Sequence, residues 1–267
     1  MMTTLALITG ATGGIGSAIA HKLAGQGYSL ILHGRSQTKL NKLLQELCGS
    51  HHSISADISK PLMCEKLIDD AFKIGTVSLL VNNAGVSHFA NFTSSDIDEK
   101  QTTHIMQINL IAPILLTKAF ISRTKPNFQG TIVNVGSALG SIGFPGFSLY
   151  CASKFGLKGL SEALSREYAD SHIRVVYFGP RTTNTSINSQ QVTDMNKALN
   201  SKVDSAEFVA SQFMQLLNSN KRRKIVGWPE KLFARINGVL PELVDKAFKQ
   251  KIKKIKQFAN IVTGDIK

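Results

Sequence analysis

The sequence predicts an α/β fold, a doubly wound parallel sheet of about seven strands with helices on both faces. Short apolar runs rich in β-branched residues alternate with segments of helical length and period. The expected strands are residues 5–9, 29–33, 53–56, 79–82, 131–135, 174–178 and 224–227. Helical segments between them include residues 17–26, 38–48 and 161–169. Right-handed crossovers then place ligands at the carboxyl ends of the strands.

Composition excludes several classes of protein. An apolar fraction of 43% and few aromatic residues are ordinary for a globular domain. The most apolar windows, such as residues 110–116, are shorter than the ~18–20 residues that a bilayer-spanning helix needs. The N-terminus has no signal-peptide pattern. Because Cys48, Cys64 and Cys151 show neither disulfide-framework nor zinc spacing, and the histidines show no ligand spacing, we expect no metal site and a reducing, cytoplasmic location.

The net charge of +13 is distributed unevenly. Residues 221–267 contain 13 Lys and Arg against 4 Asp and Glu, so the rest of the chain carries only +4. This distribution indicates an ordinary enzyme body with a basic appendage, and it argues against a nucleic acid partner.

A glycine-rich turn joins the first expected strand to the first helix. It reads Thr9-Gly10-Ala11-Thr12-Gly13-Gly14-Ile15-Gly16. Glycine permits a tight turn and lets a pyrophosphate approach the backbone, while the following helix presents free N–H groups to the phosphates. A sharp strand-to-helix connection is the alternative, but the strand before and the helix after favour nucleotide binding.

Tyr150 and Lys154 lie four residues apart, so a helix would place both on one face. Ser137 follows the strand at residues 131–135, where this architecture builds its sites. A phenol beside an ammonium can transfer a proton, because the positive charge stabilises the phenolate by lowering its pKa. Each residue alone has an ordinary structural explanation, whereas together they predict catalysis.

These motifs, in their order and spacing, resemble the short-chain dehydrogenase/reductase family over residues 4–227, which implies a Rossmann-type fold. The resemblance implies Asn109, Ser137, Tyr150 and Lys154 as the catalytic residues, with Ser137 and Tyr150 contacting the substrate. It also implies a set of residues that bind the cofactor. They are Gly10, Thr12, Gly13, Gly14, Ile15, Gly16, Arg35, Asp57, Ile58, Asn83, Ala84, Gly85, Tyr150, Lys154, Pro180 and Thr185.

The end of the second strand favours NADP over NAD. It reads His33-Gly34-Arg35-Ser36, with no carboxylate to accept the ribose hydroxyls of NAD. Arg35 stands where many NADP-using relatives bind the 2′-phosphate, and a guanidinium suits that anion. The alternative is a solvent-facing arginine. A second basic residue that the family often has is absent, because Gly13 occupies its place.

One residue departs from the family pattern. The family usually has glycine after the proline at position 180, whereas this chain has Arg181. We expect Arg181 to point outward into solvent, with contact to cofactor phosphate or an anionic substrate as the alternative.

We expect residues 1–228 to form the dinucleotide-binding and catalytic domain, and residues 229–267 to form its basic, amphipathic helical extension. Pro241 should interrupt the extension. The extension could lie on the enzyme body or on a partner subunit, contact an anionic membrane surface, or bind an acidic protein. The resemblance implies a homo-dimer or homo-tetramer.

The predicted function is NADP(H)-dependent interconversion of a carbonyl and an alcohol, with Tyr150 as the general acid/base. The residues expected around the substrate are mostly apolar, which favours a ketone, aldehyde or acyl chain. They are Leu139, Ile142, Phe144, Phe147, Ile187 and the region 228–240. The alternative is a non-catalytic nucleotide-binding scaffold or redox sensor, which the basic tail could attach to a membrane surface.

Overall fold

The computed structural model describes residues 4–125 and 128–259. Seven parallel strands form one sheet in the order β3-β2-β1-β4-β5-β6-β7, which confirms the predicted doubly wound fold. The strands are β1 (Leu5–Ile8), β2 (Ser29–Gly34), β3 (His52–Ser55), β4 (Val77–Asn82), β5 (Gly130–Val135), β6 (Ile173–Gly179) and β7 (Arg223–Ile225).

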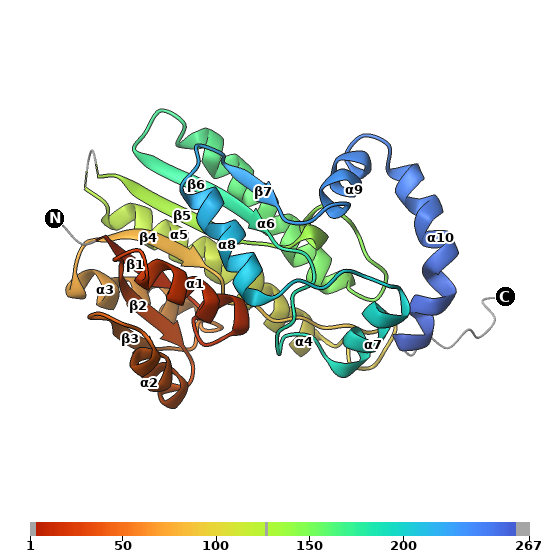
Figure 1. Ribbon diagram of the computed structural model, residues 1–267, viewed down its shortest axis with the longest axis horizontal. Helices are drawn as coiled ribbons and strands as arrows, with labels where there is room; N and C mark the ends of the chain where they lie inside the picture. Colours follow the sequence, from red (N-terminus) through yellow and green to blue (C-terminus); the bar gives the residue numbers. More distant parts are fainter. Residues whose placement is uncertain (1–3, 126–127, 260–267) are drawn as a thin grey trace.

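Helices cover both faces of the sheet (Figure 1). Those of the first half are α1 (Gly14–Ala24), α2 (Gln37–Glu46), α3 (Pro61–Ile74) and α4 (Glu99–Met106), which runs through the π-helical turn η1 (Gln107–Ile111) into α5 (Ala112–Arg123). The second half has the 3-10 turn η2 (Ala138–Gly140), α6 (Ser148–Glu167), α7 (Gln190–Ala198), α8 (Ala206–Leu217), α9 (Glu230–Asn237) and α10 (Pro241–Phe258).

Alternation along each strand divides the core into two layers. Ala6 and Ile8 on β1 pack with α1, α2 and α8, whereas Leu5 and Leu7 pack with α3 and α5. Because both faces are covered, the strands are apolar at nearly every position. That is why continuous apolar runs, rather than alternating ones, marked them in the sequence.

One helix is longer than the sequence predicted. The helix expected at residues 161–169 is the end of α6, which begins at Ser148. The first turns of α6 carry Tyr150 and Lys154 toward the cleft described below, so they lack the apolar period of an ordinary surface helix.

The helical run Glu99–Arg123 has the length and apolar composition of a bilayer-spanning helix. Half of its most apolar window is nevertheless buried inside the protein. Leu116 and Phe120 pack with residues of α3 and the sheet, so this run is a helix of the protein core.

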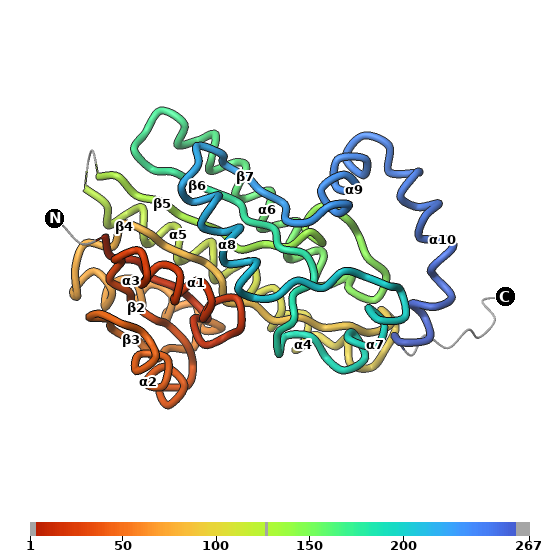
Figure 2. Tube along the Cα trace, in the orientation of Figure 1, coloured from red at the N-terminus to blue at the C-terminus, as the bar shows by residue number. Residues whose placement is uncertain are grey.

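A third apolar cluster lies beyond the carboxyl ends of the strands, where Figure 2 shows the chain passing through α7, α9 and α10. Phe248 and Ile255 of α10 pack there with Phe144 and Phe147. These two residues lie just before α6, and Phe147 is its N-cap. The chain breaks between α9 and α10 as predicted, with Pro241 at the start of the second helix. This packing brings the extension to the open end of the cleft.

Candidate active site

A cleft of about 860 Å³ lies at the carboxyl ends of the strands and extends from Gly10 to Phe248. Its size is within the range of sites that enclose small molecules and cofactors. All of the predicted cofactor-binding residues line it, together with Ser137. Asn109 is the one predicted site residue that lies behind the wall of the cleft.

The glycine turn has the shape of a phosphate cradle. Gly10 has a φ of +62°, and a Cβ atom there would lie 2.8 Å from the Cα of Ala84. The Asn83 side chain donates to the carbonyls of Thr9 and Gly10 at 2.9 and 3.1 Å, which fixes the turn against the end of β4. No side chain caps the N-terminus of α1, so its first N–H groups remain available to an anion. These residues fit the pyrophosphate of a dinucleotide.

Thr185 lies directly over this turn. A Cβ atom on Gly14 would come within 2.5 Å of the Thr185 methyl group. The segment after β6 therefore covers the start of α1, and Thr185 itself lines the cleft.

Two cations, Arg35 and Lys39, line the cleft at the end of β2 and the start of α2. The Ser36 hydroxyl caps α2 by accepting from the Lys39 N–H at 3.3 Å, which sets the orientation of this turn. Asp57 is the nearby carboxylate in the cleft wall. The Ser59 hydroxyl donates to it at 2.8 Å, and this bond is the main reason that the pKa of Asp57 is lowered.

The backbone of Ser137 is held in place by Tyr177 of β6. The Tyr177 hydroxyl donates to the Ser137 carbonyl at 2.7 Å and accepts from the Ser137 N–H at 3.1 Å. Both groups are buried. Gly136 and Gly140 lie so close to the Tyr177 ring that a Cβ atom at either position would collide with it. Tyr177 is therefore a positioning residue. The sequence did not identify it, because no motif or spacing links Tyr177 to Ser137.

Tyr150 lines the same end of the cleft as Ser137. Burial raises the pKa of Tyr150 to about 12, and the nearby Ser137 side chain opposes that rise. Because the effect of burial on this pKa outweighs the effects of the neighbouring groups, the phenol is protonated at neutral pH. It can therefore donate a proton.

Lys154 lies one turn further along α6 and is almost fully buried. Its Nζ donates to the Val135 carbonyl at 3.1 Å and lies 5.7 Å from the centroid of the Tyr150 ring. Burial lowers the pKa of the Lys154 ammonium to about 8. A Cβ atom on Gly85 would lie 3.5 Å from this nitrogen, so the small residue leaves room beside it.

Asn109 occupies the π-helical turn η1 between α4 and α5. Its amide accepts from the Val86 N–H and donates to the Val86 carbonyl, each at 2.9 Å. It also donates to the Ser153 hydroxyl at 3.1 Å. Asn109 thus joins the loop after β4 to the helix that carries Tyr150 and Lys154. A π-turn often marks a functional position.

The expectation that Arg181 points outward is wrong. Its side chain is 5% exposed and makes two bonds to Asp204, at 2.7 and 2.8 Å, and one to Glu230 at 3.1 Å. Gly227 has a φ of +97°, and a Cβ atom there would lie 2.7 Å from the Arg181 Cδ. Arg181 therefore connects the segment after β6 to the start of α9. The sequence did not reveal this because both carboxylates are distant along the chain.

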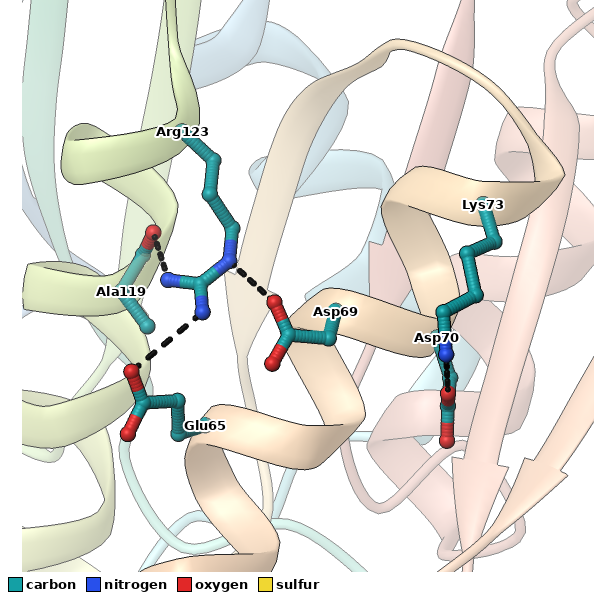
Figure 3. A network of polar contacts seen from close by, with 6 residues as sticks. All are labelled: Glu65, Asp69, Asp70, Lys73, Ala119 and Arg123. Carbon is teal, nitrogen blue, oxygen red and sulfur yellow. Dashed lines mark hydrogen bonds and ion pairs between the residues drawn. The ribbon is translucent and has the colours of Figure 1, made fainter.

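We expect Arg181→Ala to lower the free energy of unfolding by about 3–5 kcal/mol, because it leaves the buried Asp204 carboxylate unpaired. Arg123 is the matched control. It contacts Asp69 at 2.5 Å and Glu65 at 3.3 Å on the surface (Figure 3). Since exposed pairs contribute little, Arg123→Ala should cost about 1 kcal/mol or less. Urea denaturation measures both, and equal losses would contradict a buried connecting role for Arg181.

The far end of the cleft is mainly apolar. The predicted residues Leu139, Ile142, Phe144, Phe147 and Ile187 all line it. Trp228 and Phe233 from the region around α9 and Phe248 from α10 complete this end, and the cations Lys202 and Lys251 lie at its edge. Lys39, Lys202, Phe248 and Lys251 were missed in the sequence, because only the folded chain brings them to the cleft. Among residues 4–125 and 128–259, no three His, Cys, Asp or Glu side chains are grouped to hold a metal ion.

Comparison with known proteins agrees with this geometry. The sequence profile of the short chain dehydrogenase family matches residues 4–196. The chain belongs to this family. Among its relatives are L-xylulose reductase of Aspergillus niger, 37% identical over 66% of this chain and 66% of the relative, and the 3-oxoacyl-[acyl-carrier-protein] reductase FabG of Vibrio cholerae, 34% identical over 73% and 77%.

Solved structures of short-chain dehydrogenases share the fold. One from Burkholderia cenocepacia in complex with NADP is 25% identical, covers 83% of this chain and 95% of its own, and has a TM-score of 0.74. Another from Burkholderia phymatum in complex with NAD is 20% identical, with a TM-score of 0.79 over 90% and 95%. A nicotinamide dinucleotide cofactor is therefore supported for this short-chain dehydrogenase.

Proposed function

We propose that this protein is an NADP(H)-dependent oxidoreductase that interconverts a carbonyl and an alcohol. One observation carries the proposal: Tyr150, Ser137 and Lys154 meet at the end of a single cleft whose other end is the phosphate cradle at Gly10 to Gly16. The named relatives are reductases, which supports the same reaction type.

The residues have distinct roles in reduction. When bound, the reduced nicotinamide supplies a hydride to the carbonyl carbon. Tyr150 gives its proton to the carbonyl oxygen, and the Ser137 hydroxyl donates a hydrogen bond to that oxygen as negative charge develops on it. In this proposal Lys154 would bind the nicotinamide ribose, and its Nζ, 5.7 Å from the centroid of the Tyr150 ring, would stabilise the phenolate that remains on Tyr150. Oxidation of the alcohol uses the same groups in the opposite direction.

NADP is the proposed cofactor because Arg35 and Lys39 lie together where the 2′-phosphate would be held, and Asp57 is already bonded to Ser59. We expect Arg35→Ala/Lys39→Ala to raise the KM for NADPH about 10²- to 10⁴-fold, since it removes two charge-assisted bonds of roughly 1.5–3 kcal/mol each. The KM for NADH should change little. Lys42→Ala on the outer side of α2 is the matched control. Steady-state kinetics with both cofactors gives the KM values. An equal rise in KM for NADPH and NADH, or an equal rise in the double variant and the control, would refute the assignment.

The proposed substrate is a lipophilic ketone, aldehyde or acyl-chain carbonyl, because the far end of the cleft is lined by Phe144, Phe147 and Phe248. The test is a panel of apolar carbonyls and polar sugars with NADPH and NADH. Turnover of sugars but not of apolar carbonyls would remove the substrate class. No turnover with any carbonyl, despite tight NADPH binding, would favour a nucleotide-binding scaffold or redox sensor instead.

We further propose that the protein acts in the cytoplasm as a homo-dimer or homo-tetramer. The family resemblance supports the assembly. Exposed apolar side chains on the outer sides of α5 and α6, Ile114 and Phe155, agree with a covered face there.

A further inference from the structure

We propose that the corner formed by α9 and the first half of α10 docks on the surface of an anionic lipid bilayer. The α9–α10 corner is defined here as residues 228–249. Figure 1 shows the two helices at one end of the molecule, beyond the carboxyl ends of the strands.

The corner exposes an unusual amount of apolar surface. Fifteen large apolar side chains are exposed in the described residues, and six of them lie between positions 228 and 243. They are Trp228, Leu232, Phe233, Val239, Leu240 and Leu243, of which Val239 is 77% and Trp228 67% exposed. No residue of α9 is buried. Much of the apolar face of this amphipathic helix is therefore left uncovered by the described residues.

Charge indicates which partner this surface suits. The corner itself contains four Lys and Arg against three Asp and Glu, and Glu230 is already paired with Arg181. The second half of α10 adds four more cations and no carboxylate, so residues 228–259 contain eight Lys and Arg against three Asp and Glu. None of the eight cations forms an ion pair within residues 4–125 and 128–259. On α10, Val244 and Ile255 face the protein, while Lys246, Lys249 and Lys253 are exposed.

Exposed Trp, Leu and Val beside unpaired lysines match an interfacial helix on anionic lipid. A second copy of the chain is a poorer partner. A two-fold interface through this surface would bring together two copies of residues 228–259, each with five more cations than carboxylates. The observations thus favour a negatively charged bilayer.

The corner also borders the cleft. Trp228, Phe233 and Phe248 line its far end, so docking would turn that end toward the bilayer. This orientation would let a lipophilic carbonyl enter the cleft from the membrane. Entry of the substrate from the membrane rests on the proposed function, whereas docking on the bilayer does not. Vesicle binding itself needs neither cofactor nor substrate, so its failure is separable from a failure of catalysis.

The test is flotation of the full chain with vesicles of neutral phosphatidylcholine, and with vesicles that also contain about 30% phosphatidylglycerol. The wild-type protein should float with the anionic vesicles and should be released by high salt, because salt screens the attraction. Binding to neither vesicle would overturn the proposal.

Two pairs of variants make the test specific. Val239→Asp/Leu240→Asp should reduce partition into anionic vesicles at least about tenfold, whereas Leu62→Asp, on an equally exposed leucine of α3, should not. Lys246→Glu/Lys249→Glu should reduce it similarly, whereas Lys22→Glu/Lys42→Glu on α1 and α2 should not. The charge variants remove no buried group, so they keep the test decisive if the apolar variant folds poorly.

Equal losses in the corner variants and their controls would contradict docking through this surface. Light scattering is the second measurement. If Val239→Asp/Leu240→Asp dissociates an oligomer and the wild-type protein does not bind anionic vesicles, the surface contacts a second copy of the chain. The membrane proposal is then wrong.

Discussion

Replacing Tyr150 with phenylalanine is expected to lower kcat for carbonyl reduction by about 10²–10⁴-fold, because the substitution removes the group that gives its proton to the substrate oxygen. The phenol lies at the catalytic end of the cleft, which Ser137 also lines. Its pKa is raised to about 12 by burial, so the lost proton is one that the wild-type protein carries at neutral pH. The affinity for NADPH should change by no more than about threefold, since the phosphate cradle is untouched.

Tyr168→Phe is the matched control, because it removes a phenol at the other end of α6, outside the cleft. Stopped-flow and steady-state assays of NADPH oxidation measure both variants. If Tyr150→Phe kept more than about a tenth of the wild-type kcat, proton donation by Tyr150 would be ruled out.

Lys154→Met is expected to abolish turnover and yet to leave the protein at least as stable as the wild type at pH 7. A buried ammonium is costly to the fold, as shown by the lowering of the Lys154 pKa from 10.5 to about 8. Each unit of that shift corresponds to about 1.4 kcal/mol, so the cost is about 3 kcal/mol. Methionine fills a similar volume without the charge.

The sign of the pH dependence follows from linkage. Between about pH 8 and 10.5 the unfolded chain holds the Lys154 proton and the folded protein does not, so the wild-type stability rises with pH across this window. The cost is fully present below about pH 8 and is gone above about pH 10.5. The advantage of Lys154→Met should therefore be largest at pH 7 and should shrink toward pH 10.5.

Lys158→Met, one turn further along α6, is the control for this experiment and should show no such trend. Urea denaturation from pH 7 to pH 10.5 gives the two curves. A Lys154→Met protein that is clearly less stable than the wild type at pH 7 would show that the bond from Lys154 to the Val135 carbonyl outweighs the burial cost.

The parts of the site that the sequence predicted are those encoded by local spacing. The turn from Gly10 to Gly16 depends on a strand before it and a helix after it, and the Tyr150–Lys154 pair depends on one turn of helix. Both patterns can be recognised in the sequence without knowledge of any long-range contact. The structure brings these residues together in one cleft, but their catalytic roles remain predictions.

The parts that the sequence did not predict depend on distant contacts. The Arg181 side chain was expected to point into solvent, because its partners Asp204 and Glu230 lie far from it in the sequence. Tyr177 holds Ser137 only because β5 and β6 are neighbours in the sheet. Local pattern cannot identify residues whose function arises from tertiary packing.

The central claim is that one dinucleotide spans from the glycine cradle to Tyr150, and a crystal structure of the protein with bound NADP⁺ tests it most directly. We predict the pyrophosphate at the N-terminus of α1, the 2′-phosphate beside Arg35 and Lys39, and the nicotinamide ring next to the Tyr150 hydroxyl. A dinucleotide bound elsewhere, or a nicotinamide that does not reach a Tyr150 hydroxyl directed into the cleft, would contradict the account.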